Sequence, residues 1–97
     1  MKRRIEFSDS ARVQFVSAVR YIQKDDPTAA RSFRVKAERS LVRLIDFPDS
    51  GRSIPEFPEL SYREIIVPPY RLFYTVMDDR VLVVGVWHSA QIPNPPV

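Results

Sequence analysis

The feature that most constrains the fold is Asp26-Pro27, a pair of residues that separates two long stretches with helical periodicity. An acidic N-cap accepts hydrogen bonds from the first free amides of a helix, and proline suits the first helical position because the amide there has no partner. A second helix should therefore begin at Pro27, directly after a first helix ends. Two helices joined by so short a connection pack side by side in opposite directions.

Apolar residues mark one face of each predicted helix. In the first, expected over about residues 9–24, the apolar positions are Ala11, Phe15, Ala18, Val19 and Ile22. In the second, which Pro48 ends, they are Ala30, Phe33, Ala37, Leu41, Leu44 and Ile45. The two stripes predict a helical hairpin that buries one side.

Four segments are predicted to be strands, and they cover residues 3–8, 60–67, 70–77 and 80–88. Residues 48–58 carry three prolines and are expected to form an ordered loop, whereas Asp78-Asp79 can form a hairpin turn. The predicted order is βααβββ. The fold class is α+β, with the helical hairpin packed on one face of a mostly antiparallel four-stranded sheet. Residues 1–92 should form a single domain and residues 93–97 a flexible tail.

Composition limits the function classes. A chain of 97 residues with 44% hydrophobic and 28% charged residues has room for one folded domain. It has no cysteine, which excludes disulfides and sulfur-based zinc sites. The longest apolar run, residues 81–87, is too short to cross a bilayer, and Glu6 and Asp9 interrupt any signal peptide. We expect a cytoplasmic protein with no membrane partner. Without a glycine-rich phosphate loop, paired catalytic carboxylates or metal-ligand spacing, no cofactor and no metal are predicted.

Several short patterns, in this order and at this spacing, resemble the RelE/ParE superfamily of toxins from type II toxin–antitoxin modules. The likeness extends from Ile5 to about Ile92. The patterns are Phe7-Ser8 at the end of the first strand, Ala11 and Ala29-Ala30 early in the helices, residues 44–48 followed by Gly51-Arg52, Arg63, residues 70–74, Asp78-Asp79, and Val86-Trp87-His88.

This resemblance implies a cognate antitoxin protein as partner and allows a higher-order toxin–antitoxin assembly. It leaves two activities open. ParE-type members poison DNA gyrase, whereas RelE-type members cleave mRNA on the ribosome. Arg63, Gly51-Arg52 and the ending of the last strand favour the ParE type. The lysines and the terminal tyrosine of RelE are absent, and Gln91 stands where a family arginine would fall. A degraded homologue that only binds its antitoxin is a third reading.

Three residues are candidates for catalysis if the chain is a nuclease. Arg71 matches the family arginine that helps hold the scissile phosphate. If Leu72 faces the helices, alternation points Arg71 into the open face of the sheet. His88, the only histidine, could exchange a proton near neutral pH. Glu56 could act as a base in the loop. Each residue also has a purely structural interpretation. Arg71 could be a solvated or paired arginine, His88 a histidine at a strand end, and Glu56 an exposed carboxylate.

Other candidates concern binding. Arg63 and Arg52 are expected to contact the target or a phosphate, and Trp87 is expected to pack in the core or at an interface. Three arginines of the second helix are either a solvated face or a docking surface for an acidic antitoxin segment: Arg31, Arg34 and Arg39.

Overall fold

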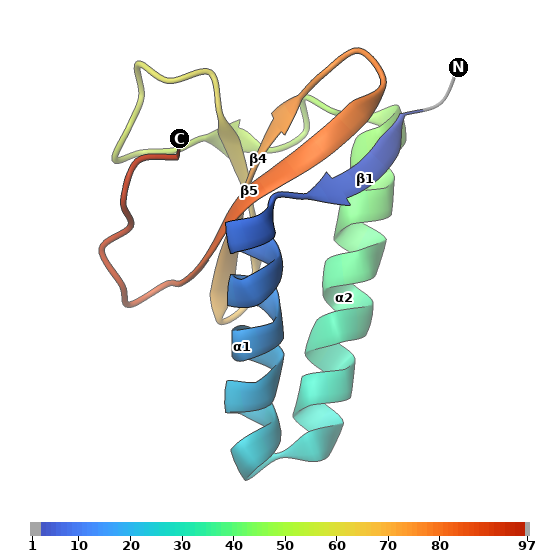
Figure 1. Ribbon diagram of the computed structural model, residues 1–97, viewed down its shortest axis with the longest axis vertical. Helices are drawn as coiled ribbons and strands as arrows, with labels where there is room; N and C mark the ends of the chain where they lie inside the picture. The colour runs from blue at the N-terminus through green and yellow to red at the C-terminus, as the bar shows by residue number, and fades with distance from the viewer. Residues whose placement is uncertain (1–2, 97) are drawn as a thin grey trace.

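The computed structural model describes residues 3–96, and it confirms the α+β class. The chain runs β1 (Arg4–Phe7), α1 (Asp9–Asp25), α2 (Pro27–Asp46), β2 (Arg52–Ser53), β3 (Arg63–Val67), β4 (Tyr70–Val76) and β5 (Arg80–His88). The two helices lie side by side and the sheet packs across one end of them (Figure 1).

Side-chain caps set the start of each helix, as the sequence predicts. The hydroxyl of Ser8 accepts a hydrogen bond of 3.1 Å from the Ala11 amide at the start of α1. The Asp26 carboxylate accepts hydrogen bonds of 3.1 Å from the amides of Thr28 and Ala29 at the start of α2. With Pro27 at the first position of α2, both ends of the short connection are fixed by local chemistry.

The sheet has five strands in the order β1-β5-β4-β3-β2, one more than predicted. The additional strand, β2, lies within the predicted loop and has only two residues, which pair with Glu64 and Arg63. Residues 60–62 do not join β3, which begins at Arg63. β1 is parallel to β5 and the other pairs are antiparallel, so the predicted mostly antiparallel sheet is confirmed.

The main core lies between the helices and one face of the sheet. Phe33, Leu41 and Leu44 of α2 pack in one buried cluster with Leu72 and Tyr74 of β4. Because side chains alternate along a strand, Arg71 and Phe73 point to the other face. The predicted orientation of β4 is correct. We call this other side the far face.

The far face is covered rather than open. Phe73 and Ile54 are both fully buried, and Ile54 comes from the loop that follows β2. A register irregularity between Phe73 and Tyr74 shifts the alternation of β5. Val83 therefore belongs to the helix-side core, while Trp87 lies beside Gly85 and Phe73 on the far face. Trp87 and Val83 therefore do not share a face, although both have odd numbers in the same strand.

No helix within residues 3–96 is long and apolar enough to cross a membrane. In the C-terminal segment, Pro93 is buried and Pro95 is exposed. The flexibility predicted for residues 93–97 remains a prediction, and its last residue, Val97, lies outside the described residues.

Candidate functional site

Arg71 is the centre of an ion-pair cluster on the far face. Its Nε donates a hydrogen bond of 2.7 Å to Glu64. Its two terminal nitrogens donate to the two carboxylate oxygens of Glu56, at 2.8 and 2.6 Å. The Arg52 Nε donates to the other oxygen of Glu64 at 2.6 Å. We call Arg52, Glu56, Glu64 and Arg71 the far-face cluster.

Three strands and one loop bring these groups together. Glu64 of β3 lies opposite Phe73 of β4 in the register, and Arg52 of β2 lies opposite Glu64. Arg71 and Glu64 therefore project from neighbouring strands on one face. Glu56 belongs to the loop between β2 and β3 and reaches Arg71 from above the sheet. The Arg71 guanidinium also lies 5.1 Å from the centroid of the Phe73 ring, within the range of a cation–π contact.

The predicted accessibility of Arg71 is wrong. The sequence predicts a guanidinium displayed on an open face. In the structure Arg71 is only 6% exposed and Glu64 only 1% exposed. The fork of an arginine binds a carboxylate through two parallel hydrogen bonds, with the geometry that it also uses for phosphate. Glu56 takes up that fork, and Glu64 takes the remaining Nε. A phosphate can reach this guanidinium only if Glu56 leaves.

The ion pairs also change the titration of Glu56. Hydrogen bonds from Arg71 lower the pKa of the Glu56 carboxyl to about 2. The two carboxylates raise the pKa of Arg71, Glu56 having the larger effect. A carboxylate this acidic is a weak proton acceptor at neutral pH. The geometry therefore does not support the predicted role of Glu56 as a general base.

His88 lies on the other side of the sheet. In the register it faces Tyr70, and the two rings meet edge to face with centroids 5.2 Å apart. Tyr70 in turn contacts Phe33 of α2. The His88 Nδ1 accepts a hydrogen bond of 3.0 Å from the Ala90 amide, which leaves Nε2 as the free nitrogen. Arg71 faces Trp87 instead, so the two predicted catalytic residues do not share a site.

Arg63 makes structural contacts on β3, near the edge of the sheet that is formed by β2. It donates a hydrogen bond of 2.8 Å to the Gly51 carbonyl and lies 3.8 Å from the Asp49 carboxylate. Nearby, the buried Tyr74 hydroxyl donates to the Pro48 carbonyl at 2.8 Å and accepts from the Gly51 amide at 3.0 Å. These contacts fix the chain as it leaves α2. Arg63 and Arg52 both stay partly exposed, so a binding role for them stays a prediction.

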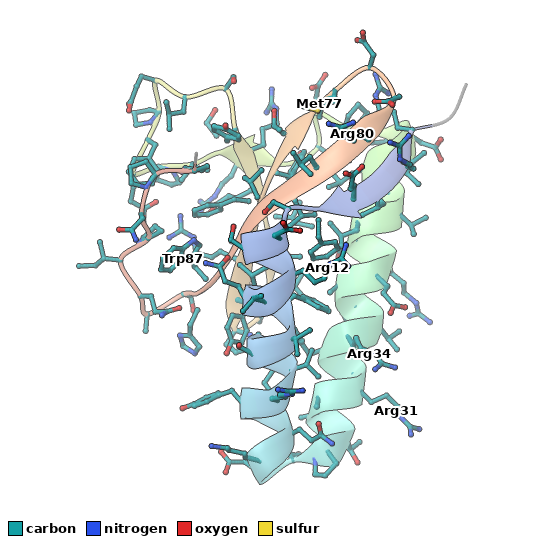
Figure 2. The ribbon with its side chains drawn as sticks, in the orientation of Figure 1. Arg12, Arg31, Arg34, Met77, Arg80 and Trp87 are labelled. Atoms are coloured by element: carbon teal, nitrogen blue, oxygen red, sulfur yellow. The ribbon has the colours of Figure 1, made fainter. Side chains whose placement is uncertain are left out.

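The three predicted antitoxin-binding arginines are exposed on α2. Arg31 and Arg34 point away from the sheet and line a shallow hollow with Gln23 and Pro27 (Figure 2). Arg39 lies nearer β1, beside Val42. None of them has a carboxylate partner within salt-bridge distance in residues 3–96.

A groove that shares Glu38 and Val42 with the surface around Arg39 was not predicted from the sequence. We call it the hairpin groove. It lies where β1, α1 and α2 meet, and Arg12 lies at this position in Figure 2. The groove is lined by Ile5, Phe7, Arg12, Phe15, Val16, Glu38, Leu41 and Val42. Val42 is 57% exposed there, although it would be expected to avoid water. In the sequence, the only sign of this groove is that the helical apolar stripe is wider than one buried face requires.

No group of three histidine, cysteine, aspartate or glutamate residues within residues 3–96 is placed to hold a metal ion. The far-face cluster is chemically a closed set, with two arginines matched by two carboxylates. Its geometry can fix the loop and β2 to the sheet. As it stands, its buried guanidinium, that of Arg71, is fully taken up by the two carboxylates, and of the two arginines only Arg52 keeps an exposed side chain.

Residues 5–93 match the family model described as the ParE toxin of the type II toxin–antitoxin system parDE. The chain belongs to the ParE toxin family. Within the wider RelE/ParE superfamily, it is 30% identical over 79 residues to a protein named Toxin RelE2 from Caulobacter vibrioides, and the match covers 79% of this chain and 85% of that protein.

Two solved structures share the fold of this ParE-family chain. A chain of the chromosomal ParDE system from P. aeruginosa aligns with a TM-score of 0.68 and 11% identity, over 90% of this chain and 96% of that one. A free-state mutant of the E. coli toxin RelE aligns with a TM-score of 0.56 and 20% identity, over 93% and 86% of the two chains. The resemblance found in the sequence is thereby confirmed. The likeness to both branches does not separate gyrase poisoning from mRNA cleavage.

Proposed function

We propose that this ParE-family chain is a growth-inhibiting toxin of the bacterial cytoplasm, that it poisons DNA gyrase, and that a cognate antitoxin neutralises it. The choice of DNA gyrase as the target is supported mainly by the burial and ion pairing of Arg71. Its guanidinium is buried and bound by Glu56 and Glu64, on the face of the sheet opposite His88.

Cleavage of RNA through its 2′-hydroxyl needs a base, an acid and cations around the phosphate. The Arg71 guanidinium is taken up by Glu56 and Glu64, and the exposed carboxylate of Glu56 has a pKa of about 2. His88 lies on the helix side, where Arg71 cannot help it. A gyrase poison needs none of this chemistry, because it acts by binding.

Ribosome-dependent mRNA cleavage is the second candidate. It is favoured by the 30% identity to a protein named Toxin RelE2. For this activity the loop that carries Glu56 would have to leave Arg71 when the ribosome binds. An inactive homologue that binds only the antitoxin is the third candidate.

The hairpin groove supports the antitoxin part of the proposal. An antitoxin segment with apolar side chains would cover Val16 and Val42, which are exposed in the lone chain. Acidic residues flanking that segment would meet Arg39 and, further along α2, Arg34 and Arg31. Such a segment would gain both burial of apolar surface and charge complementarity.

The test is induction of the chain in a susceptible bacterium, with and without the protein encoded by the adjacent reading frame. Within minutes of induction, chromosome breaks that depend on gyrase are expected while ribosome-bound mRNA stays intact, and the adjacent protein is expected to restore growth. Rapid mRNA fragmentation abolished by His88→Ala would overturn the gyrase assignment. Normal growth after induction would support the inactive homologue instead.

A further inference from the structure

The outer edge of β5 is only partly covered by β1. The parallel register pairs β1 with Arg80–Val83, and the last backbone hydrogen bond runs from the Ser8 amide to the Val83 carbonyl at 2.9 Å. β5 continues to His88, well beyond that point. A strand edge of this kind exposes backbone donors and acceptors that can accept another strand.

Two glutamine side chains occupy the uncovered edge. The Val86 amide donates to the Gln14 side-chain oxygen at 2.9 Å, and the His88 amide donates to the Gln91 side-chain oxygen at 2.7 Å. Alternate residues of an antiparallel strand direct their amides to the same side. Val86 and His88 are such a pair. The two side-chain carbonyls thus stand where the backbone carbonyls of a further strand would stand.

Both glutamines line one cavity between α1 and the end of β5. The other lining residues are Ser17, Ala18, Tyr21, Tyr70, Val86 and His88. Ala18, Tyr70 and Val86 supply apolar surface, while Ser17 and Tyr21 are exposed at the mouth. A side chain projecting from a strand on β5 could enter this cavity, as peptide side chains do when they extend a sheet.

We infer that an extended segment of the antitoxin adds to β5 as a strand in line with β1, and that its backbone carbonyls replace the Gln14 and Gln91 oxygens at Val86 and His88. This inference rests on the proposed function. It deepens that function by naming the surface and the backbone groups that the antitoxin would use.

The position of the cavity favours the antitoxin as occupant. Val16 lines the hairpin groove, and Gln14 and Ser17 line the cavity, so the two hollows flank the same stretch of α1. Between them lies Val13, which is 66% exposed. One segment that crosses α1 over Val13 would contact the groove, the helix and the β5 edge in succession. The displaced glutamines lie at the protein surface, where their amides can bond to water.

The test measures backbone amide exchange in the full chain by NMR, alone and with the protein encoded by the adjacent reading frame. In the complex, the Val86 and His88 amides should exchange about 10-fold slower or more, because a strand protects them better than a mobile side chain does. The side-chain amide signals of Gln14 and Gln91 should shift. Ser17→Trp, which blocks the cavity mouth, should weaken binding at least about 10-fold, and Lys24→Trp on the same helix should not.

The outcomes separate the two proposals. A stable complex in which the Val86 and His88 amides exchange as in the free chain would overturn the strand addition and leave the antitoxin pairing intact. Absence of any complex would overturn both. Slowing of the same two amides in the free chain as its concentration rises would assign the edge to a second copy and overturn the antitoxin as its occupant.

Discussion

Arg71 and His88 stand on neighbouring strands but on opposite faces of the sheet. Arg71 faces Trp87 in the β4–β5 register, and His88 faces Tyr70. A difference of one residue in register sends the two side chains to opposite sides. Two residues that the sequence suggests as catalytic partners are therefore separated by the sheet itself. Arg71 instead joins Glu56 and Glu64 in the far-face cluster.

The first prediction concerns the stability that Arg71 provides. Arg71→Met removes the buried partner of Glu64, which is 1% exposed, and leaves Arg52 to balance its charge. The free energy of unfolding should fall by about 3 kcal/mol, the lower end of the cost of breaking a buried ion pair, because Arg52 still balances part of the charge. Urea unfolding measures the loss.

Arg4→Met is the matched control, because its carboxylate partners are exposed, and it should cost less than about 1 kcal/mol. Adding Glu64→Leu to Arg71→Met should recover part of the loss. Equal effects of Arg71→Met and Arg4→Met would show that the cluster does not stabilise the fold.

The second prediction concerns how the stability of the fold depends on pH. The pKa of Glu56 in the folded chain, about 2, lies below its ordinary value of 4.5. A group whose pKa is lowered by folding contributes stability above its unfolded pKa and loses it as the pH falls through the folded value. The stabilisation by Glu56 should be complete at neutral pH and should decline from about pH 4.5 towards pH 2.

Glu56→Gln tests this directly. The wild type should unfold at a higher temperature than the variant at pH 7, and the difference should shrink at pH 4 and again at pH 3. Because the Glu56 side chain is 38% exposed, solvent reduces the size of the effect. A difference between the two proteins that stays constant over this pH range would contradict the ion pair with Arg71.

The third prediction concerns Gly51, where the chain passes close to Tyr74 and β3. A Cβ at this position would lie 2.7 Å from the Glu64 backbone oxygen and closer still to the Tyr74 hydroxyl. Gly51→Ala should therefore displace buried backbone and cost about 1–3 kcal/mol, as overpacking does. Thermal unfolding measures the loss.

Gly85→Ala is the control, because its Cβ would meet only side-chain atoms, at 3.1 Å from Trp87 and 3.4 Å from Phe73. Its cost should be smaller. If Gly85→Ala proves the more damaging variant, the close approach at Gly51 is not the constraint that we describe.

The fourth prediction concerns the hairpin groove. Val42→Asp places a charge where the antitoxin should bury apolar surface, and it should weaken the complex by about 10-fold or more without unfolding the toxin. Ile66→Asp on β3 is a comparable change at a residue that is 48% exposed. Calorimetric titration with the adjacent-frame protein should show weaker binding for Val42→Asp alone. Equal binding by both variants would place the antitoxin elsewhere.

Local rules were sufficient for most of the fold. The caps at Ser8 and Asp26 need only neighbouring residues, so both helices could be predicted from sequence. Alternation along β4 gave the correct face for Arg71. β2 was not predicted, because two residues carry almost no periodic signal. It is a strand only through the pairing of Arg52 and Ser53 with β3.

The candidate site was harder to predict because it depends on contacts between distant residues. Glu56 reaches Arg71 across 15 positions, through a loop whose path no local pattern determines. Glu64 lies within a predicted strand, but its burial between two arginines could not be predicted from the sequence. The irregularity at Phe73 and Tyr74 also has no clear sequence signal, and it changes which residues of β5 share a face.

The most direct measurement of the central claim is NMR of the Arg71 Nε–H in the isolated chain, during titration with inorganic phosphate and then with a short RNA. If Glu56 and Glu64 hold the guanidinium, this proton exchanges slowly with water and its signal does not move with either ligand. A rapidly exchanging proton whose signal shifts on addition of RNA would show an available phosphate clamp and would contradict the account.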